Sequence, residues 1–186
     1  MRIISGQLKG KKIFFTNSST TRPLRDFVKE NIFNLLSHTK KFRTDLNNLE
    51  ILDLYSGVGS FGIECLSRNV NKVVFVEKDP TAFSILKKNI LKLDLSAKVE
   101  LNNIDIDDFI ERPNIKKFDL IFLDPPYKDV TYLEIVKKLK KKKIFKDKHT
   151  VIVHREKNSE EKINNLLKIS LIKNYGRSKI MFGTFK

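Results

Sequence analysis

The chain has 186 residues, of which 40% are hydrophobic and 32% charged, a balance typical of one globular domain rather than of disordered or collagen-like sequence. No apolar run approaches the ~18 residues of a transmembrane helix, and the start lacks the apolar region of a signal peptide, so we expect a cytoplasmic protein without membrane contact. The single cysteine cannot form an internal disulfide, and the three histidines are scattered, so we expect no metal site.

The net charge of +15 is distributed unevenly along the chain. Residues 1–43 carry 10 basic and 2 acidic side chains, residues 44–136 carry 11 and 16, and residues 137–186 carry 16 and 4. A slightly acidic centre between two strongly basic ends is typical of a small-molecule site inside a frame that binds a polyanion such as nucleic acid. The run Lys140–Lys143 has a simpler alternative interpretation, as the solvated end of a helix.

The first 45 residues predict an extension in front of a main domain at 46–186. Apolar stretches around Gly6 and Gly10 predict a short hairpin. Apolar residues at helical spacing then predict a helix from about 26 to 37. We expect this extension to face the substrate.

From residue 50 onward, short apolar runs alternate with helical patterns, which predicts a mainly parallel sheet. Asp79 before Pro80 predicts the start of one connecting helix, and another is predicted from about 130 to 142. The last two strands stand too close in sequence for a helix between them, so they must be antiparallel. The fold class is therefore α/β, with strands predicted at 51–55, 73–76, 99–101, 120–123, 151–153, 170–175 and 180–185.

A glycine-rich segment follows the first predicted strand and leads into a helix. Gly57, Gly59 and Gly62 have the spacing of a dinucleotide-binding fingerprint, and Glu77 lies 20 residues beyond Gly57 at the end of the second strand. Glycines let the backbone approach a ligand closely, and an acidic side chain at this place accepts hydrogen bonds from a ribose diol. The segment predicts a site for a nucleotide cofactor, with a simple tight turn as the alternative.

The carboxylate of Asp53, just before the glycines, favours one cofactor over the others. It would repel a pyrophosphate, whereas it would hold the ammonium of a methionine moiety, directly or through water. S-adenosylmethionine carries that ammonium and no phosphate, so we expect it as the cofactor. Asp105, after the third strand, is placed either to accept the adenine amino group or to cap a helix. The predicted cofactor-binding residues are Asp53, Tyr55, Ser56, Gly57, Gly59, Glu77, Lys78 and Asp105.

The tetrad Asp124-Pro125-Pro126-Tyr127 follows the fourth strand and is the most specific motif in the chain. Its two prolines remove backbone donors and hold the preceding carbonyls in fixed directions. The Asp124 carboxylate and the Pro125 carbonyl would accept both N–H bonds of an exocyclic base amine, which directs its lone pair toward an electrophile. Tyr127 would stack on the base. A proline-rich turn with a helix-capping aspartate is the alternative.

This order of motifs resembles the class I amino-methyltransferases that modify adenine N6 or guanine N2. The wider sequence, including Arg2–Gly6, Thr21–Pro23 and Gly62–Arg68, is similar to the RsmD family of bacterial 16S rRNA guanine-N2 methyltransferases over nearly the whole chain. Leu24 departs from that family, which usually has threonine after Arg-Pro.

The resemblance implies a Rossmann-like fold and methyl transfer from S-adenosylmethionine to one guanine of 16S rRNA. It implies a 30S subunit or its assembly intermediate as the partner, and we expect the enzyme to be a monomer. Both basic ends of the chain are expected to hold the RNA backbone, with a merely solvated surface as the alternative for the candidate residues near the N-terminus. The predicted substrate-binding residues are Lys9, Lys11, Lys12, Arg22 and Pro23.

Three other functions stay open from the sequence. An adenine-N6 methyltransferase acting on DNA or RNA would use the same tetrad. A nicotinamide-dependent oxidoreductase would share the glycine loop, although Asp53 and the lack of a proton-relay group disfavour it. A non-catalytic RNA-binding assembly factor would keep only the basic surface. His154, at the end of the fifth strand, could approach the cofactor or substrate, but we favour its interpretation as a hydrogen-bonded strand-end histidine.

Overall fold

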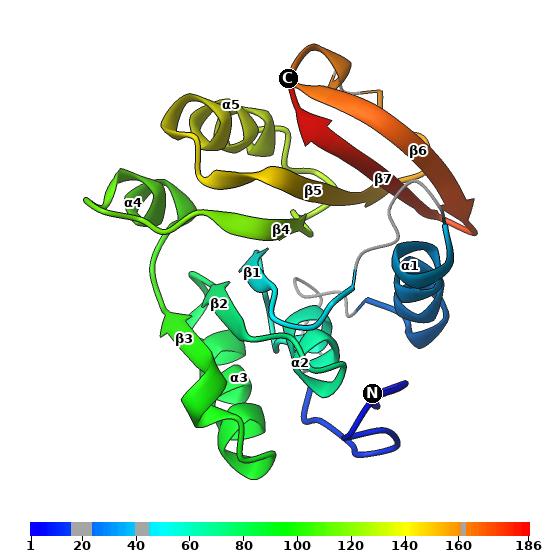
Figure 1. The fold of residues 1–186 in the computed structure, drawn as a ribbon, viewed down its shortest axis with the longest axis vertical. Helices are drawn as coiled ribbons and strands as arrows, with labels where there is room; N and C mark the ends of the chain where they lie inside the picture. The colour runs from blue at the N-terminus through cyan, green and yellow to red at the C-terminus, as the bar shows by residue number, and fades with distance from the viewer. Residues whose placement is uncertain (16–23, 40–44, 161–162) are drawn as a thin grey trace.

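A seven-stranded sheet forms the centre of the protein in a computed structural model that describes residues 1–15, 24–39, 45–160 and 163–186 (Figure 1). The strands are β1 (Glu50–Leu54), β2 (Lys72–Val76), β3 (Val99–Asn102), β4 (Phe118–Leu123), β5 (Phe145–Glu156), β6 (Leu167–Tyr175) and β7 (Ser178–Phe185). They lie in the order β3-β2-β1-β4-β5-β7-β6. The strands from β3 to β5 are parallel, and β7 runs antiparallel to both β5 and β6. The predicted fold class and the antiparallel end of the sheet are confirmed.

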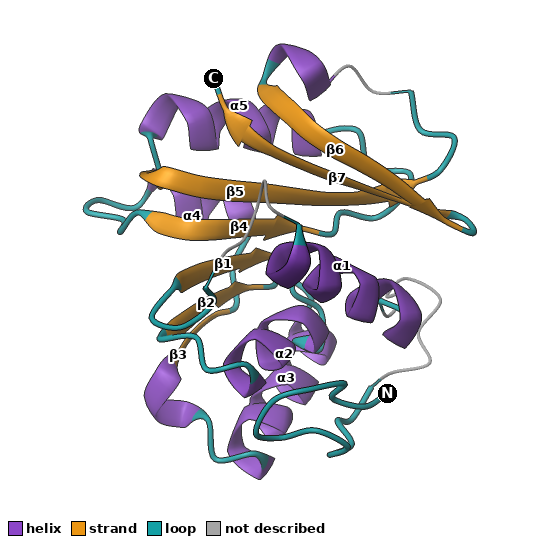
Figure 2. Ribbon diagram, turned by 45° about the vertical axis from the view of Figure 1, so that its right-hand side comes forward, coloured by secondary structure: helices purple, strands orange, loops and turns teal. Residues whose placement is uncertain are grey.

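Helices cover both faces of the sheet, because its central strands are apolar on both sides (Figure 2). The helices are α1 (Asp26–His38), α2 (Ser60–Ser67), α3 (Pro80–Lys92), α4 (Ile106–Glu111) and α5 (Tyr132–Lys142). Ile51 of β1 shares an apolar cluster with α1, α2 and α3, whereas Leu52 of the same strand shares one with α4 and α5. Successive residues of a strand point to opposite faces, so the core has two halves.

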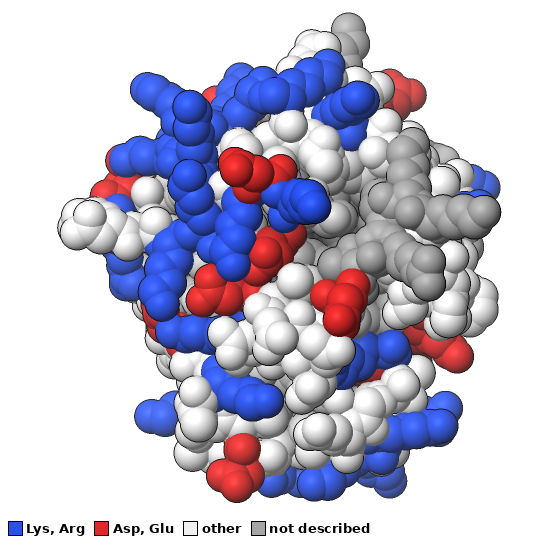
Figure 3. Space-filling model, viewed as in Figure 1, with Lys and Arg blue, Asp and Glu red and all other residues white. Residues whose placement is uncertain are grey.

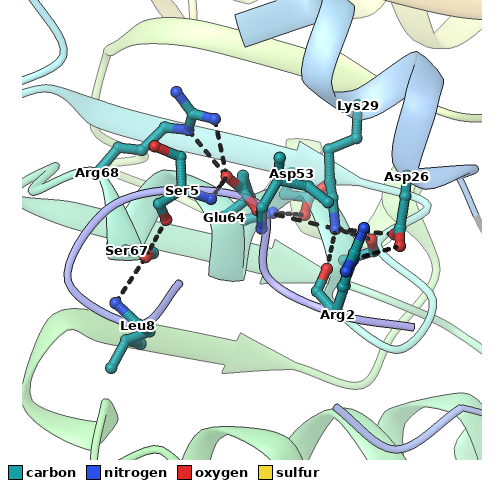
Figure 4. A network of polar contacts seen from close by, with 12 residues as sticks. Arg2, Ser5, Leu8, Asp26, Lys29, Asp53, Glu64, Ser67 and Arg68 are labelled. Atoms are coloured by element: carbon teal, nitrogen blue, oxygen red, sulfur yellow. Dashed lines mark hydrogen bonds and ion pairs between the residues drawn. The ribbon is translucent and has the colours of Figure 1, made fainter. Parts of the chain in front are cut away.

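The N-terminal segment is fastened to α2 by a buried carboxylate. The Glu64 side chain accepts hydrogen bonds from the backbone N–H groups of Ile4 at 2.7 Å and Ser5 at 3.0 Å (Figure 4). Ser67 Oγ, one turn further along the helix, accepts from the N–H of Leu8 at 3.0 Å. The segment therefore follows α2 closely and pairs its backbone groups with side chains of that helix.

Some elements differ from their sequence-based boundaries. A bridge between Arg2 and Lys12 confirms the predicted hairpin. Strand β5 begins at Phe145, well before the predicted start. The prediction missed its first half because these residues are polar and partly exposed, and so carry no apolar pattern. Helix α4 was expected only as one alternative, through a capping Asp105, since six residues are too few to show helical periodicity. Among the residues that the structure describes, no helix has the length and apolar character needed to cross a membrane.

Candidate active site

A cavity of about 810 Å³ opens where the parallel strands end. Four acidic or imidazole side chains at the ends of neighbouring strands line it, namely Asp53 of β1, Glu77 after β2, Asp124 after β4 and His154 of β5. Ligands of α/β proteins gather at this edge of the sheet. The predicted glycine loop and the tetrad therefore belong to one site, as their positions after parallel strands led us to expect.

The glycine loop is held against the end of β2 by Glu77. Gly57 and Gly59 have φ angles of 54° and 87°, a left-handed conformation that glycine adopts with little strain. The Gly57 N–H donates to Glu77 Oε2 at 2.7 Å, and the Asp79 N–H donates to Oε1 at 2.8 Å. Burial raises the pKa of Glu77. Each carboxylate oxygen can accept a second hydrogen bond, so the ribose contact of Glu77 stays a prediction.

Two buried oxygen atoms in the cavity wall have no hydrogen-bond partner among the described residues: Asp53 Oδ1 and Ser56 Oγ. The other oxygen of Asp53 accepts from the Gly62 N–H at 3.0 Å, which satisfies a donor in the first turn of α2. Burial raises the pKa of Asp53 well above its usual range, and the charges of Asp124 and Glu77 raise it further. Leaving a buried polar atom unpaired costs free energy, so both oxygens are suited to a polar ligand.

The acidic side chain of Asp105 caps a helix, which was one of its two predicted roles. Its Oδ1 accepts from the Asp107 N–H at 3.0 Å, at the start of α4. Its Oδ2 lies 3.5 Å from the ammonium nitrogen of Lys78. Asp105, Lys78 and Tyr55 all line the cavity, so the predicted cofactor contacts meet at one place. Contact of Asp105 with adenine stays a prediction.

The tetrad carboxylate is bonded to His154. His154 Nδ1 lies 2.8 Å from Asp124 Oδ1, and Nε2 lies 2.9 Å from Ser178 Oγ and 3.3 Å from the Tyr127 hydroxyl. The histidine has the hydrogen-bond partners that we predicted for a strand-end residue. It also lies near the site, as the other interpretation allowed, because β5 places it beside the end of β4 and in the cavity wall.

A buried arginine holds the backbone of the tetrad. Arg155 is 0% exposed, and its guanidinium donates to the carbonyls of Pro126 at 2.8 Å and Tyr127 at 2.9 Å. The same group stands over the ring of Tyr132, 4.5 Å from its centroid. The Pro125 carbonyl is only marginally within its reach, at 3.5 Å. The prolines are therefore not alone in fixing this loop, and no sequence pattern pointed to Arg155.

Basic and aromatic side chains line the outer part of the cavity. Arg25 before α1, Lys128 after the tetrad and Arg177 in the β6–β7 turn are exposed and belong to its lining. Tyr175 also lines it, and the ring of Phe27, which is 63% exposed, meets Tyr175 edge-on with centroids 5.8 Å apart. We call these five residues the rim. Cations and exposed rings are the side chains that bind phosphates and unstacked bases.

On one face of the molecule, acidic and basic side chains are separated. Figure 3 shows acidic side chains toward the middle of one face, bordered on one side by a dense group of lysines and arginines over α4 and α5. Part of this basic charge is neutralised locally, since Lys138 and Lys142 lie 2.6 Å from carboxylate oxygens of Asp107 and Glu111. The uneven charge along the sequence is therefore also uneven in space.

None of the predicted substrate-binding residues is found in the described lining of the cavity. Arg22 and Pro23 lie outside the described residues. Lys9, Lys11 and Lys12 are exposed, but they do not line the cavity. Their hairpin is bonded to the last residue of α2, the end of this helix that points away from the glycine loop. Contact of these lysines with RNA stays a prediction.

Known proteins are similar to this chain in sequence. Residues 1–184 match the family described as conserved hypothetical protein 95. The ribosomal RNA small subunit methyltransferase D of Haemophilus influenzae is 41% identical over 129 residues, which cover 68% of this chain and 64% of that protein. The protein of the same name from Buchnera aphidicola subsp. Acyrthosiphon pisum is 34% identical over 155 residues, covering 83% of this chain and 78% of that one.

Two solved structures resemble the whole chain. A putative methylase from Haemophilus influenzae is 30% identical with a TM-score of 0.77, covering 100% of this chain and 98% of the other. A putative methyltransferase from Escherichia coli has a TM-score of 0.84 at 23% identity and the same coverage, and it supports the fold alone. This chain is therefore a methyltransferase that belongs to the conserved hypothetical protein 95 family, which is the RsmD family.

Proposed function

We propose that the protein transfers a methyl group from S-adenosylmethionine to the exocyclic N2 of one guanine in 16S rRNA. One observation carries the proposal. The Asp124 carboxylate lines the same cavity as the unpaired oxygens of Asp53 and Ser56, so an amine acceptor and a cofactor site adjoin each other. The names of the relatives from Haemophilus and Buchnera support rRNA of the small subunit as the substrate.

S-adenosylmethionine supplies an electrophilic methyl group when it is bound. Asp53 would hold the ammonium of its methionine part, and Ser56 would form a hydrogen bond with a neighbouring polar group of the cofactor. Glu77 would accept the ribose hydroxyls, and Asp105 would accept the adenine amino group. The unpaired Asp53 Oδ1 and Ser56 Oγ fit this assignment, because both atoms are buried acceptors without a donor in the described structure.

The tetrad acts on the guanine amine. Asp124 Oδ1 is occupied by His154, so Oδ2 would accept one N–H of the amine while the Pro125 carbonyl accepts the other. Both bonds direct the nitrogen lone pair away from the ring. As the nitrogen becomes positively charged, the Asp124 carboxylate stabilises that charge, and the amine afterwards loses one proton to water. Tyr127 provides a ring on which the base stacks.

The rim binds the RNA around the target base. Arg25, Lys128 and Arg177 would contact phosphates, and the Phe27–Tyr175 pair would contact a base beside the guanine. Residues 1–45 form the RNA-facing extension and residues 46–186 the methyltransferase domain. The enzyme acts as a monomer in the cytoplasm on the 30S subunit or its assembly intermediate.

The test is transfer of labelled methyl from S-adenosylmethionine to 30S subunits that lack this modification, with naked 16S rRNA and DNA in parallel. Mass spectrometry of the product nucleosides identifies the acceptor. We expect N2-methylguanosine from the ribosomal substrate and no product from DNA. N6-methyladenine would keep the role of the tetrad and refute the assigned base. RNA binding without transfer to any substrate would indicate a non-catalytic assembly factor.

A further inference from the structure

Two consecutive residues at the end of β5 form hydrogen bonds with the tetrad. His154 bonds to the side chain of Asp124, and Arg155 bonds to the backbone carbonyls of Pro126 and Tyr127. Consecutive residues of a strand point to opposite sides of the sheet, so the tetrad is held from two directions at once. Neither residue belongs to the site that the sequence predicted.

The hydrogen bonds of His154 define which ring nitrogen carries the proton. An ionised carboxylate only accepts hydrogen bonds, so Nδ1, at 2.8 Å from Asp124 Oδ1, must donate. In the neutral ring Nε2 is then an acceptor, and the Ser178 hydroxyl at 2.9 Å and the Tyr127 hydroxyl at 3.3 Å are the donors beside it. The His154 side chain is only 8% exposed, so water competes little for either nitrogen.

We propose that His154 is the positioning residue of the methyl transfer, which holds Asp124 Oδ1 so that Oδ2 faces the base amine. The inference rests on the proposed function. Without a fixed partner, the Asp124 carboxylate can rotate about its side-chain single bonds. Rotation would lose the alignment of the base amine. The donor from β5 removes this freedom. His154 itself does not touch the amine.

Arg155 allows the effect of His154 on the Asp124 side chain to be distinguished from an effect on the backbone of the tetrad. Arg155 fixes the carbonyls of the tetrad independently of His154, through bonds of 2.8 Å and 2.9 Å. Loss of the imidazole should therefore release the Asp124 side chain while the loop backbone keeps its course. A defect confined to turnover is the expected signature, rather than unfolding of the site.

Two variants divide the functions of the ring. His154→Asn keeps an N–H donor near the place of Nδ1 and loses the contact with Ser178. His154→Gln keeps a polar group near the place of Nε2 and loses the donor to Asp124. We expect kcat of the Gln variant to fall about 10-fold or more, in line with a lost bond to a charged group, and kcat of the Asn variant to fall less than 3-fold or so. KM for RNA and affinity for S-adenosylhomocysteine should stay within about 2-fold in both.

Thermal unfolding of both variants provides the control, since a merely structural histidine would make turnover follow stability. Equal losses of kcat in the Asn and Gln variants, or losses that track the melting temperature, would overturn the proposal. Rescue by Asn alone would support it, because only that variant restores the donor.

A measurement without turnover decides the same point independently. The chain has three histidines, so ¹⁵N NMR of histidine-labelled protein resolves the ring nitrogens, and the His154→Asn spectrum assigns them. From the hydrogen bonds we expect a signal of a protonated Nδ1 and one of an accepting Nε2, and a change of both signals in Asp124→Ala. An Nε2–H tautomer, or a ring insensitive to Asp124→Ala, would refute the positioning role. If the wild type showed this tautomer and methylated no guanine, the proposed function alone would fail.

Discussion

The ammonium of Lys29 lies 3.8 Å from the carboxylate of Glu64, and both side chains are excluded from solvent, at 1% and 0% exposure. Lys29 also donates to the Arg2 carbonyl at 2.9 Å and to the Ser60 hydroxyl at 3.3 Å (Figure 4). Glu64 bonds to Arg68 on its other side. The pair thus joins α1, α2 and the N-terminal segment, and α2 begins at the glycine loop of the site.

Removal of one partner of this pair should destabilise the protein. Lys29→Met leaves a buried carboxylate with one cation fewer, and we expect the free energy of unfolding to fall by about 2 kcal/mol or more. The double variant Lys29→Met/Glu64→Gln should be less destabilised than the sum of the single variants, by at least about 1 kcal/mol. Urea unfolding of all four proteins measures this coupling, and strictly additive effects would mean that the two groups do not interact.

Lys29 should also make stability depend on pH in the alkaline range. Burial lowers the pKa of Lys29 below 10.5, and the nearby carboxylates of Glu64 and Asp26 only partly oppose this. Between the lowered pKa and 10.5 the unfolded chain binds more protons than the native protein, so this residue's contribution to the free energy of unfolding rises with pH. The free energy of unfolding of the wild type should therefore rise relative to that of Lys29→Met as pH rises toward 10.5. A constant difference across that range would contradict the assignment.

Asp53 should make cofactor affinity depend on pH. The pKa of this carboxyl is raised by burial, whereas an ammonium ligand favours its charged form. Affinity for S-adenosylhomocysteine, which carries the same ammonium, should rise with pH through a range above the usual one for aspartate. Asp53→Asn keeps an oxygen for the Gly62 N–H and should bind more weakly with no such rise. Calorimetric titrations at several pH values test this, and parallel curves for both proteins would rule out the contact.

Asp124→Ala should cut turnover about 100-fold or more, the scale of one preorganised electrostatic contact. Affinity for S-adenosylhomocysteine should change little, since Asp53 and Ser56 stay in place. Single-turnover methylation of the ribosomal substrate measures the rate, with cofactor titration as the control. Near-normal turnover would show that this carboxylate is not the acceptor of the amine.

The rim should contribute more to RNA affinity than the N-terminal hairpin. Arg25→Gln and Arg177→Gln should each weaken binding of a 16S rRNA fragment and reduce the slope of log affinity against log salt by about 1. The triple replacement of Lys9, Lys11 and Lys12 by Gln should weaken it less, because these residues lie away from the cavity.

Lys98→Gln is the charge-matched control for this comparison. Lys98 is exposed and precedes β3, at the edge of the sheet opposite the cavity, so its loss should leave the salt dependence unchanged. A larger loss of affinity in the triple lysine variant than in either rim variant would place the main RNA contact on the hairpin instead.

The sequence by itself determined the α/β fold and brought the glycine loop and the tetrad to one edge. Local patterns suffice for this, because apolar runs mark buried strands and the ends of parallel strands meet. Asp53 lies within the first such run, and Glu77 and Asp124 each directly follow one, so their convergence in one cavity was predictable. The capping role of Asp105 was likewise legible as one of two alternatives.

Only the tertiary structure decided what holds these residues in place. His154 reaches Asp124 because β4 and β5 pair with Leu123 opposite Val153, and Ser178 reaches His154 because the last hairpin folds back beside β5. The partners are separated by 30 and 24 residues, and no local pattern encodes the register of strands so far apart. The burial of Lys29 and Arg155 follows the same logic, since long cations look like surface residues until packing supplies their acceptors.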